Sequence, residues 1–133
     1  MHAKSLIVAV LSLALLSSLA SAQPEEKVAG SKAASVRQAI ADYIQRDAKL
    51  KRGFFLYDPG LQRVVQLKFD HVHAGVTRTA KGQFFACVDM RSESKSLYDL
   101  DVYLEQTAQG LQPAKLVIHK VDGKKRPAPS APR

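Results

Sequence analysis

Two histidines and the only cysteine of the chain are the residues best suited to do chemistry. His71 and His73 lie two residues apart, and Cys87 is followed by Asp89 two positions later. Residues two apart on a regular strand point to the same face, so the two histidines could hold one Zn²⁺ or Cu²⁺ ion if a neighbouring strand supplied a third ligand. The candidates for that third ligand are Cys87, Asp89, Asp99, Asp101 and His119.

Whether these ligands converge depends on how the strand around Cys87 pairs with the strand that follows it. One register sets Cys87 opposite Asp101 and Asp89 opposite Asp99, which makes an acidic cluster. A slip of one residue sets Cys87 beside Leu100 instead, which makes it a core cysteine. The sequence leaves both registers open.

The spacing of the three histidines also fits a purely structural role. His71 and His73 share strand parity with Val65, Leu67 and Phe69, so they continue an apolar face unless a bulge intervenes. His119 follows the parity of Val117 and Val121 in the same way. This pattern favours hydrogen-bonded histidines at the rim of a sheet over metal ligands.

Cys87 is predicted to be a buried structural cysteine. It lies in the middle of the strand-like stretch FFACVDM, and its apolar neighbours and Asp89 would raise the pKa of the thiol. A nucleophilic cysteine needs the opposite, namely cationic neighbours or a helix N-terminus that favours the thiolate. We therefore predict no catalytic residue.

Asp99, Asp101 and Tyr103 alternate along one side of the stretch LYDLDVYLE. Alternating aspartates are common on solvent-facing strands, although two of them could also act as an acid and a base. We expect these three residues to line a ligand-binding surface on the concave face of the sheet.

The N-terminal segment resembles an export signal. Residues 1–22 contain Lys4, then an apolar run, then the small residues Ala20-Ser21-Ala22, which fit cleavage by a signal peptidase before Gln23. We predict a periplasmic or secreted protein with no transmembrane segment in the mature chain. The rest divides into a flexible lead-in over residues 23–34, one domain over residues 35–122 and a disordered, basic, Pro-rich tail over residues 123–133.

The domain is predicted to contain one helix followed by strands. Ser35 and Gln38 resemble a capping box, and the apolar stripe Val36, Ala39, Ile40, Tyr43 and Ile44 has helical spacing up to a stop before Gly53. Short strand-like stretches with tight connections follow, which excludes βαβ crossovers. The fold class expected is α+β, with one N-terminal amphipathic helix packed on an antiparallel sheet of four to five strands.

This order of elements resembles the cystatin-like and NTF2-like α+β rolls over residues 35–121. The inhibitory Gln-x-Val-x-Gly signature of cystatins is absent, so protease inhibition does not follow from the resemblance. The series FFACVDM, YDLDVYL and IHKVDGK is also similar to small exported bacterial proteins without an established activity. Neither resemblance implies a catalytic residue, because such rolls include both enzymes and binding modules.

The chain has a formal net charge of +8, with basic clusters at 46–52 and in the tail. Such clusters favour weak attraction to anionic surfaces, but they contain no interleaved aromatic residues, so specific nucleic-acid binding is not expected. Three functions remain open. The first is a non-catalytic domain that binds a partner protein or small ligand without a cofactor, the second is a periplasmic protein that binds zinc or copper, and the third is a small NTF2-like enzyme.

Overall fold

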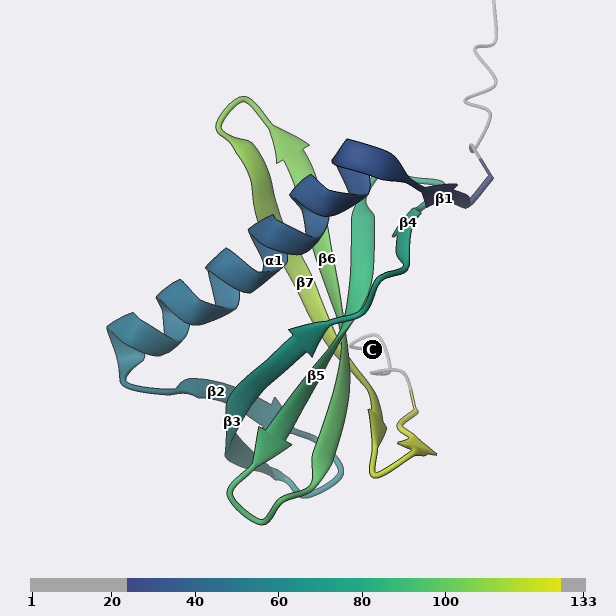
Figure 1. The fold of residues 1–133 in the computed structure, drawn as a ribbon. Coiled ribbons are helices and arrows are strands. Elements are labelled where there is room, and N and C mark those ends of the chain that lie inside the picture. The colour runs from purple at the N-terminus through teal and green to yellow at the C-terminus, as the bar shows by residue number, and fades with distance from the viewer. Residues whose placement is uncertain (1–23, 128–133) are drawn as a thin grey trace, which may run out of the picture.

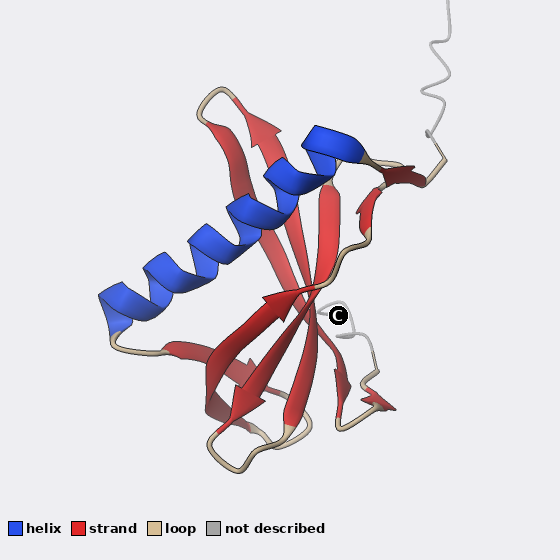
Figure 2. Cartoon of the chain, viewed as in Figure 1, coloured by secondary structure: helices blue, strands red, loops and turns tan. Residues whose placement is uncertain are grey.

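The structure is a computed structural model that describes residues 24–127 (Figure 2). The predicted signal peptide and the end of the predicted tail lie outside the described residues. The described elements are one helix and eight strands: β1 (Glu26–Val28), α1 (Gly30–Lys51), β2 (Phe54–Asp58), β3 (Arg63–Val72), β4 (Val76–Arg78), β5 (Phe84–Ser92), β6 (Leu97–Thr107), β7 (Gly110–Val121) and β8 (Lys124–Lys125).

All eight strands belong to one antiparallel sheet, which corrects the prediction of four to five strands (Figure 1). The main path runs β1-β4-β5-β6-β7-β8, while β3 joins β5 and holds β2 at a free edge. The sheet curls into a half-barrel rather than forming a simple layer under the helix. The five predicted strands are present as β2, β3, β5, β6 and β7. The three missed strands have only two or three residues each, too few for alternation to be visible in the sequence.

The ends of the domain are more regular than the sequence indicated. The predicted loose lead-in, residues 23–34, contains β1 and the first turn of α1, and β1 pairs with β4. At the other end, β8 pairs with β7 at the start of the predicted tail. Both short strands lie outside the predicted domain, residues 35–122, so the sheet extends beyond each predicted boundary.

Helix α1 begins at Gly30, so the predicted capping box at Ser35 is wrong. The Ser35 hydroxyl lies inside the helix and donates to the carbonyl of Ser31 at 2.9 Å. The predicted end is confirmed: Arg52 adopts a left-handed conformation, and the Gly53 amide donates to the carbonyl of Ala48 at 2.8 Å.

The core lies between α1 and one face of the sheet. The helix buries a stripe of four residues at helical spacing, Ala33, Val36, Ile40 and Ile44. Strand β6 buries every second side chain, as its alternation predicted: Tyr98, Leu100, Val102 and Leu104 are each at most 1% exposed. The remaining side chains of β5 and β6 consequently point to the outer face, which α1 does not cover.

One buried carboxylate, Asp58, accepts hydrogen bonds from three separate segments of the chain. Asp58 is fully buried and accepts hydrogen bonds from the Tyr98 hydroxyl at 2.8 Å, the Gly60 amide at 2.8 Å and the Arg126 guanidinium at 3.1 Å. A Cβ atom at position 60 would collide with the guanidinium of Arg126, so a larger residue there would displace this side chain from Asp58. This network ties the β2–β3 turn to the segment that follows β8.

Candidate metal centre

The register of β5 and β6 answers the question that the sequence left open. Cys87 pairs with Asp101 and Asp89 pairs with Asp99, which is the first of the two predicted registers. All four side chains therefore share the outer face, because residues between them, such as Leu100, point into the core. The sequence predicted an acidic cluster for this register, and the structure contains one.

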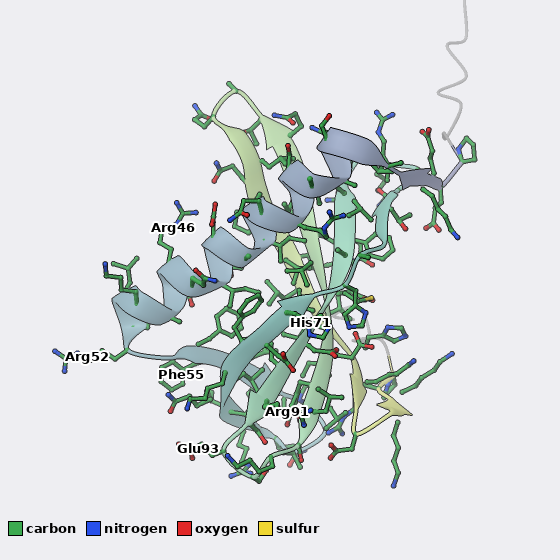
Figure 3. All side chains as sticks on the ribbon, in the orientation of Figure 1. Arg46, Arg52, Phe55, His71, Arg91 and Glu93 are labelled. Atoms are coloured by element: carbon green, nitrogen blue, oxygen red, sulfur yellow. The ribbon has the colours of Figure 1, made fainter. Side chains whose placement is uncertain are left out.

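A β-bulge in β3 brings the two histidines to the same face. Phe69 pairs with Met90, but His71 rather than Asp70 pairs with Asp89, so Asp70 is the extra residue. The bulge reverses the parity of the strand after Phe69. His71 and His73 were expected to continue the apolar face unless a bulge intervened, and because the bulge is present they do not. Figure 3 shows His71 on the side of the sheet away from α1.

A second bulge, in β7, determines the position of His119. Asp99 pairs with Lys120 and Leu100 pairs with Ile118, so His119 is the extra residue between them. Its predicted parity with the neighbouring valines consequently does not apply. The Nδ1 atom of His119 lies 3.6 Å from Oδ1 of Asp101.

The structure assembles a first set of potential ligands from three strands: Cys87, Asp99, Asp101 and His119. One ligand atom from each lies within 4.8 Å of all the others. The Cys87 thiol donates to Oδ1 of Asp101 at 3.1 Å. By contrast, Oδ1 of Asp99 and Nδ1 of His119 are buried and have no hydrogen-bond partner among the described residues. Buried polar atoms are nearly always paired with protein, ordered water or an ion, so these two atoms are free to accept a partner other than the protein.

A second set, next to the first, consists of His71, His73 and Asp89, again with ligand atoms within 4.8 Å of one another. His73 Nε2 is hydrogen-bonded to Oδ1 of Asp89 at 2.9 Å, and His71 Nε2 lies 3.9 Å from Oδ2 of the same carboxylate. The two imidazole rings are stacked with their centroids 5.2 Å apart. His71 is exposed, whereas every member of the first set is half-buried, so solvent or an exchanging ligand reaches the second set through His71.

Three carboxylates crowd together where the two sets meet. Asp89 and Asp99 are directly opposite each other on adjacent strands, and Asp101 is two residues further along β6. Like charges in directly opposed positions repel. Among the described residues, no lysine or arginine forms a salt bridge with these three carboxylates, and the basic groups within 4.0 Å of Asp89 and Asp101 are histidines. The arrangement therefore favours a bound cation.

Burial, followed by the hydrogen bond to Asp101 and the charges of the nearby carboxylates, raises the pKa of the Cys87 thiol to about 12. Cys87 is therefore a protonated thiol at neutral pH and a poor nucleophile in the absence of a cation. A divalent ion held by the surrounding carboxylates would reverse this balance, because a coordinating thiol gives up its proton.

The predicted ligand-binding residues Asp99, Asp101 and Tyr103 all lie on the outer face. The inside of the curled sheet is filled by α1 and the core, so these residues do not line a concave surface. The Tyr103 ring stacks on Phe85 with centroids 4.9 Å apart, and the ammonium group of Lys115 lies 4.3 Å from its centre. Tyr103 therefore forms one border of the cluster, and the two aspartates belong to the first ligand set.

The chain matches no known family model, and no curated protein or solved structure is significantly similar to it. The resemblance to cystatin-like and NTF2-like rolls therefore stays a prediction. The single helix of the described residues, α1, is not apolar enough to cross a membrane. The case for a function consequently depends on the geometry of the outer face.

Proposed function

We propose that this protein binds a divalent transition-metal ion, with zinc as the best fit, through Cys87, Asp99, Asp101 and His119. The observation that supports this most strongly is the pair of buried, unpartnered ligand atoms, Asp99 Oδ1 and His119 Nδ1, within a four-ligand set. A bound cation would satisfy both atoms and neutralise the opposed carboxylates.

The donor set favours zinc over the harder cations. One sulfur, one imidazole nitrogen and two carboxylate oxygens suit Zn²⁺, whereas Mg²⁺ and Ca²⁺ prefer oxygen ligands alone. Zinc bonds of about 2.0–2.3 Å separate tetrahedral ligands by roughly 3.3–3.8 Å. Separations of at most 4.8 Å therefore need only small side-chain movements to close around the ion.

The second set, His71, His73 and Asp89, is proposed to assist the first. Asp89 faces Asp99 across the strand pair, so a metal ion that enters through the exposed histidines meets a carboxylate that borders both sets. The proposed protein is accordingly a binding domain without a catalytic step. Export through residues 1–22 is part of the same proposal, and it would place the metal site in the periplasm or outside the cell.

Isothermal titration with Zn²⁺ tests the proposal on protein produced with its own N-terminal segment and purified without chelator. We expect one zinc ion per chain. The Cys87→Ser/His119→Ala double variant removes two ligands and should lower the affinity by about a hundredfold or more, since loss even of a supporting residue costs 10–100-fold. A parallel titration with Cu²⁺ compares the affinity of the site for the two metals that bind sulfur and imidazole ligands.

The matched control is Glu93→Gln/Glu105→Gln, which removes two exposed carboxylates outside both sets. It should bind zinc as the unchanged protein does. Circular dichroism of each variant verifies that it is folded. Failure of the unchanged protein to bind either metal, or equal binding by the Cys87→Ser/His119→Ala variant, contradicts the proposal.

A further inference from the structure

The exposed large apolar side chains of the described residues all lie between the end of α1 and the start of β3. They are Leu50, Phe55, Tyr57, Leu61 and Val64, with exposures between 43% and 79%. The register places three of them on the outer face, because Tyr57 pairs with Val64 and Phe55 pairs with Gln66, while the alternate residues of β2 face the core. This grouping is a surface apolar patch, a feature that often marks an interaction site.

The patch lies on an unprotected edge of the sheet. Strand β2 pairs only with β3, and its sequence FFLYD contains neither lysine nor proline. The terminal strands of the main path, β1 and β8, are two or three residues long and contain lysine. Short strands and lysines are the usual protection of a sheet edge. The β2 edge has neither, which indicates that a partner covers it.

Cations adjoin the patch on the same face. Lys68 and Arg91 are directly opposite each other on β3 and β5, and neither forms a salt bridge among the described residues. A hollow of about 340 Å³ lies beside them, lined by Gln66, Lys68, Arg91, Ser92, Glu93 and Lys95. Figure 3 shows Phe55 and Arg91 toward this end of the sheet. An anion in the hollow would relieve the repulsion between the two opposed cations.

We infer that this basic aromatic face, defined as Phe55, Tyr57, Val64, Lys68 and Arg91, docks on an anionic phospholipid surface. Aromatic rings favour the boundary between headgroups and acyl chains, and basic residues bind the headgroup phosphates. A purely anionic polymer would leave the apolar patch unused. A second copy of the chain on this face would bring the same cations together. An anionic bilayer complements both halves of the face.

Co-sedimentation with vesicles tests the inference, and its result is independent of metal binding. One vesicle population contains equal parts of phosphatidylglycerol and phosphatidylcholine, and the other contains phosphatidylcholine alone. We expect binding to the first and a large loss of binding to the second. The Lys68→Gln/Arg91→Gln variant should bind the anionic vesicles about tenfold or more weakly, because each basic residue near the surface contributes about 1 kcal/mol.

Two further variants distinguish this face from general attraction by a basic protein. Lys27→Gln/Lys81→Gln removes the same charge from two exposed lysines, one on β1 and one in the turn between β4 and β5, and should retain most of the binding. Phe55→Thr/Tyr57→Thr keeps a strand-favouring residue at each exposed position. High salt screens the charges, so the binding that the unchanged protein retains there comes from the apolar side chains, and this variant should lose it.

Three results would overturn the inference. They are absence of binding to anionic vesicles, equal losses in the Lys68/Arg91 and Lys27/Lys81 variants, and unchanged binding by the Phe55→Thr/Tyr57→Thr variant. Analytical ultracentrifugation supplies an additional criterion. If the unchanged protein is a dimer and the Phe55→Thr/Tyr57→Thr variant is a monomer, the patch is an interface between copies and the membrane assignment is wrong.

Discussion

The outer face of the sheet has two regions of opposite charge, and each contains a pair of like charges in directly opposed positions. Asp89 faces Asp99 in the candidate metal centre, and Lys68 faces Arg91 in the basic aromatic face. Strand β3 belongs to both regions and changes parity between them at the bulge. The regions differ in burial, since the Asp89 side chain is 18% exposed whereas Lys68 and Arg91 are exposed.

The difference in burial has a physical consequence. Solvent screens the exposed cations, so their repulsion costs little and their counter-anion can be a loosely held surface. Water reaches the half-buried carboxylates poorly, so their repulsion destabilises the fold more. A single tightly held cation that removes this repulsion therefore stabilises the fold more. The comparison therefore assigns a compact ion to one region and an extended anionic surface to the other.

The largest expected effect concerns metal-dependent stability. Zinc at a thousandfold excess over its dissociation constant should raise the free energy of unfolding by about 4 kcal/mol, because it binds the folded state alone. The gain should disappear in the Asp99→Asn/Asp101→Asn variant. It should persist in Lys68→Gln/Arg91→Gln, which alters the other region. Thermal unfolding with and without zinc measures all three proteins, and equal gains in all of them would break the distinction between the two regions.

Deletion of Asp70 is the next largest test, since it removes the bulge that lets β3 contribute to both regions. Without the extra residue, His71 and His73 would turn toward the core. We expect a loss of about 3 kcal/mol or more in the free energy of unfolding, because two polar rings lose their partners. Urea denaturation gives the value. The substitution Asp70→Ala keeps the residue count and serves as the control, with a loss below about 1 kcal/mol.

The high pKa of Cys87 makes zinc binding depend on pH. With that pKa at about 12, the thiol is protonated throughout the neutral range, so zinc must displace one proton. The apparent affinity should rise about tenfold per pH unit from the thiol alone. Titrations in buffers of different ionisation enthalpy count the protons released. Release of no proton from this site would remove Cys87 from the ligand set.

The same pKa predicts the behaviour of the metal-free protein in alkali. Because folding raises the pKa of Cys87 from its ordinary 9.0, this residue stabilises the fold fully below pH 9, and the contribution is lost as the pH rises toward 12. The pKa of Tyr98 is raised to about 12 by burial and by its bond to Asp58, which adds to the loss above pH 10. Urea denaturation across this range should show a smaller decline for Cys87→Ser.

The smallest effects compare the two like-charge pairs directly. In the absence of metal, Asp99→Asn should increase the free energy of unfolding by about 0.5–1 kcal/mol, because it removes one of two opposed charges in a half-buried site. Arg91→Gln should increase it by only about 0.2–0.3 kcal/mol, because its pair is screened by solvent. Chemical denaturation of the two variants at low ionic strength measures both changes. A larger gain for Arg91→Gln would contradict the argument that repulsion is stronger in the more buried pair.

Much of the fold could be predicted from local patterns. The helical stripe of α1 and the strict alternation in β6 were visible in the sequence, and both were confirmed, because each reports which side of an element faces the core. The number of strands could not be predicted in the same way. Strands β1, β4 and β8 are too short to show a period. Strands β4 and β8 pair with the longer strands β5 and β7, and β1 pairs with β4.

The sequence by itself determined which residue types were available for chemistry, that Asp99 and Asp101 share a face, and that the register around Cys87 had two alternatives. The tertiary structure alone decided the register and placed bulges at Asp70 and His119. The physical reason is that a bulge depends on the partner strand as well as on its own residues. A single extra residue reverses the parity of everything after it, and local periodicity does not reveal that change.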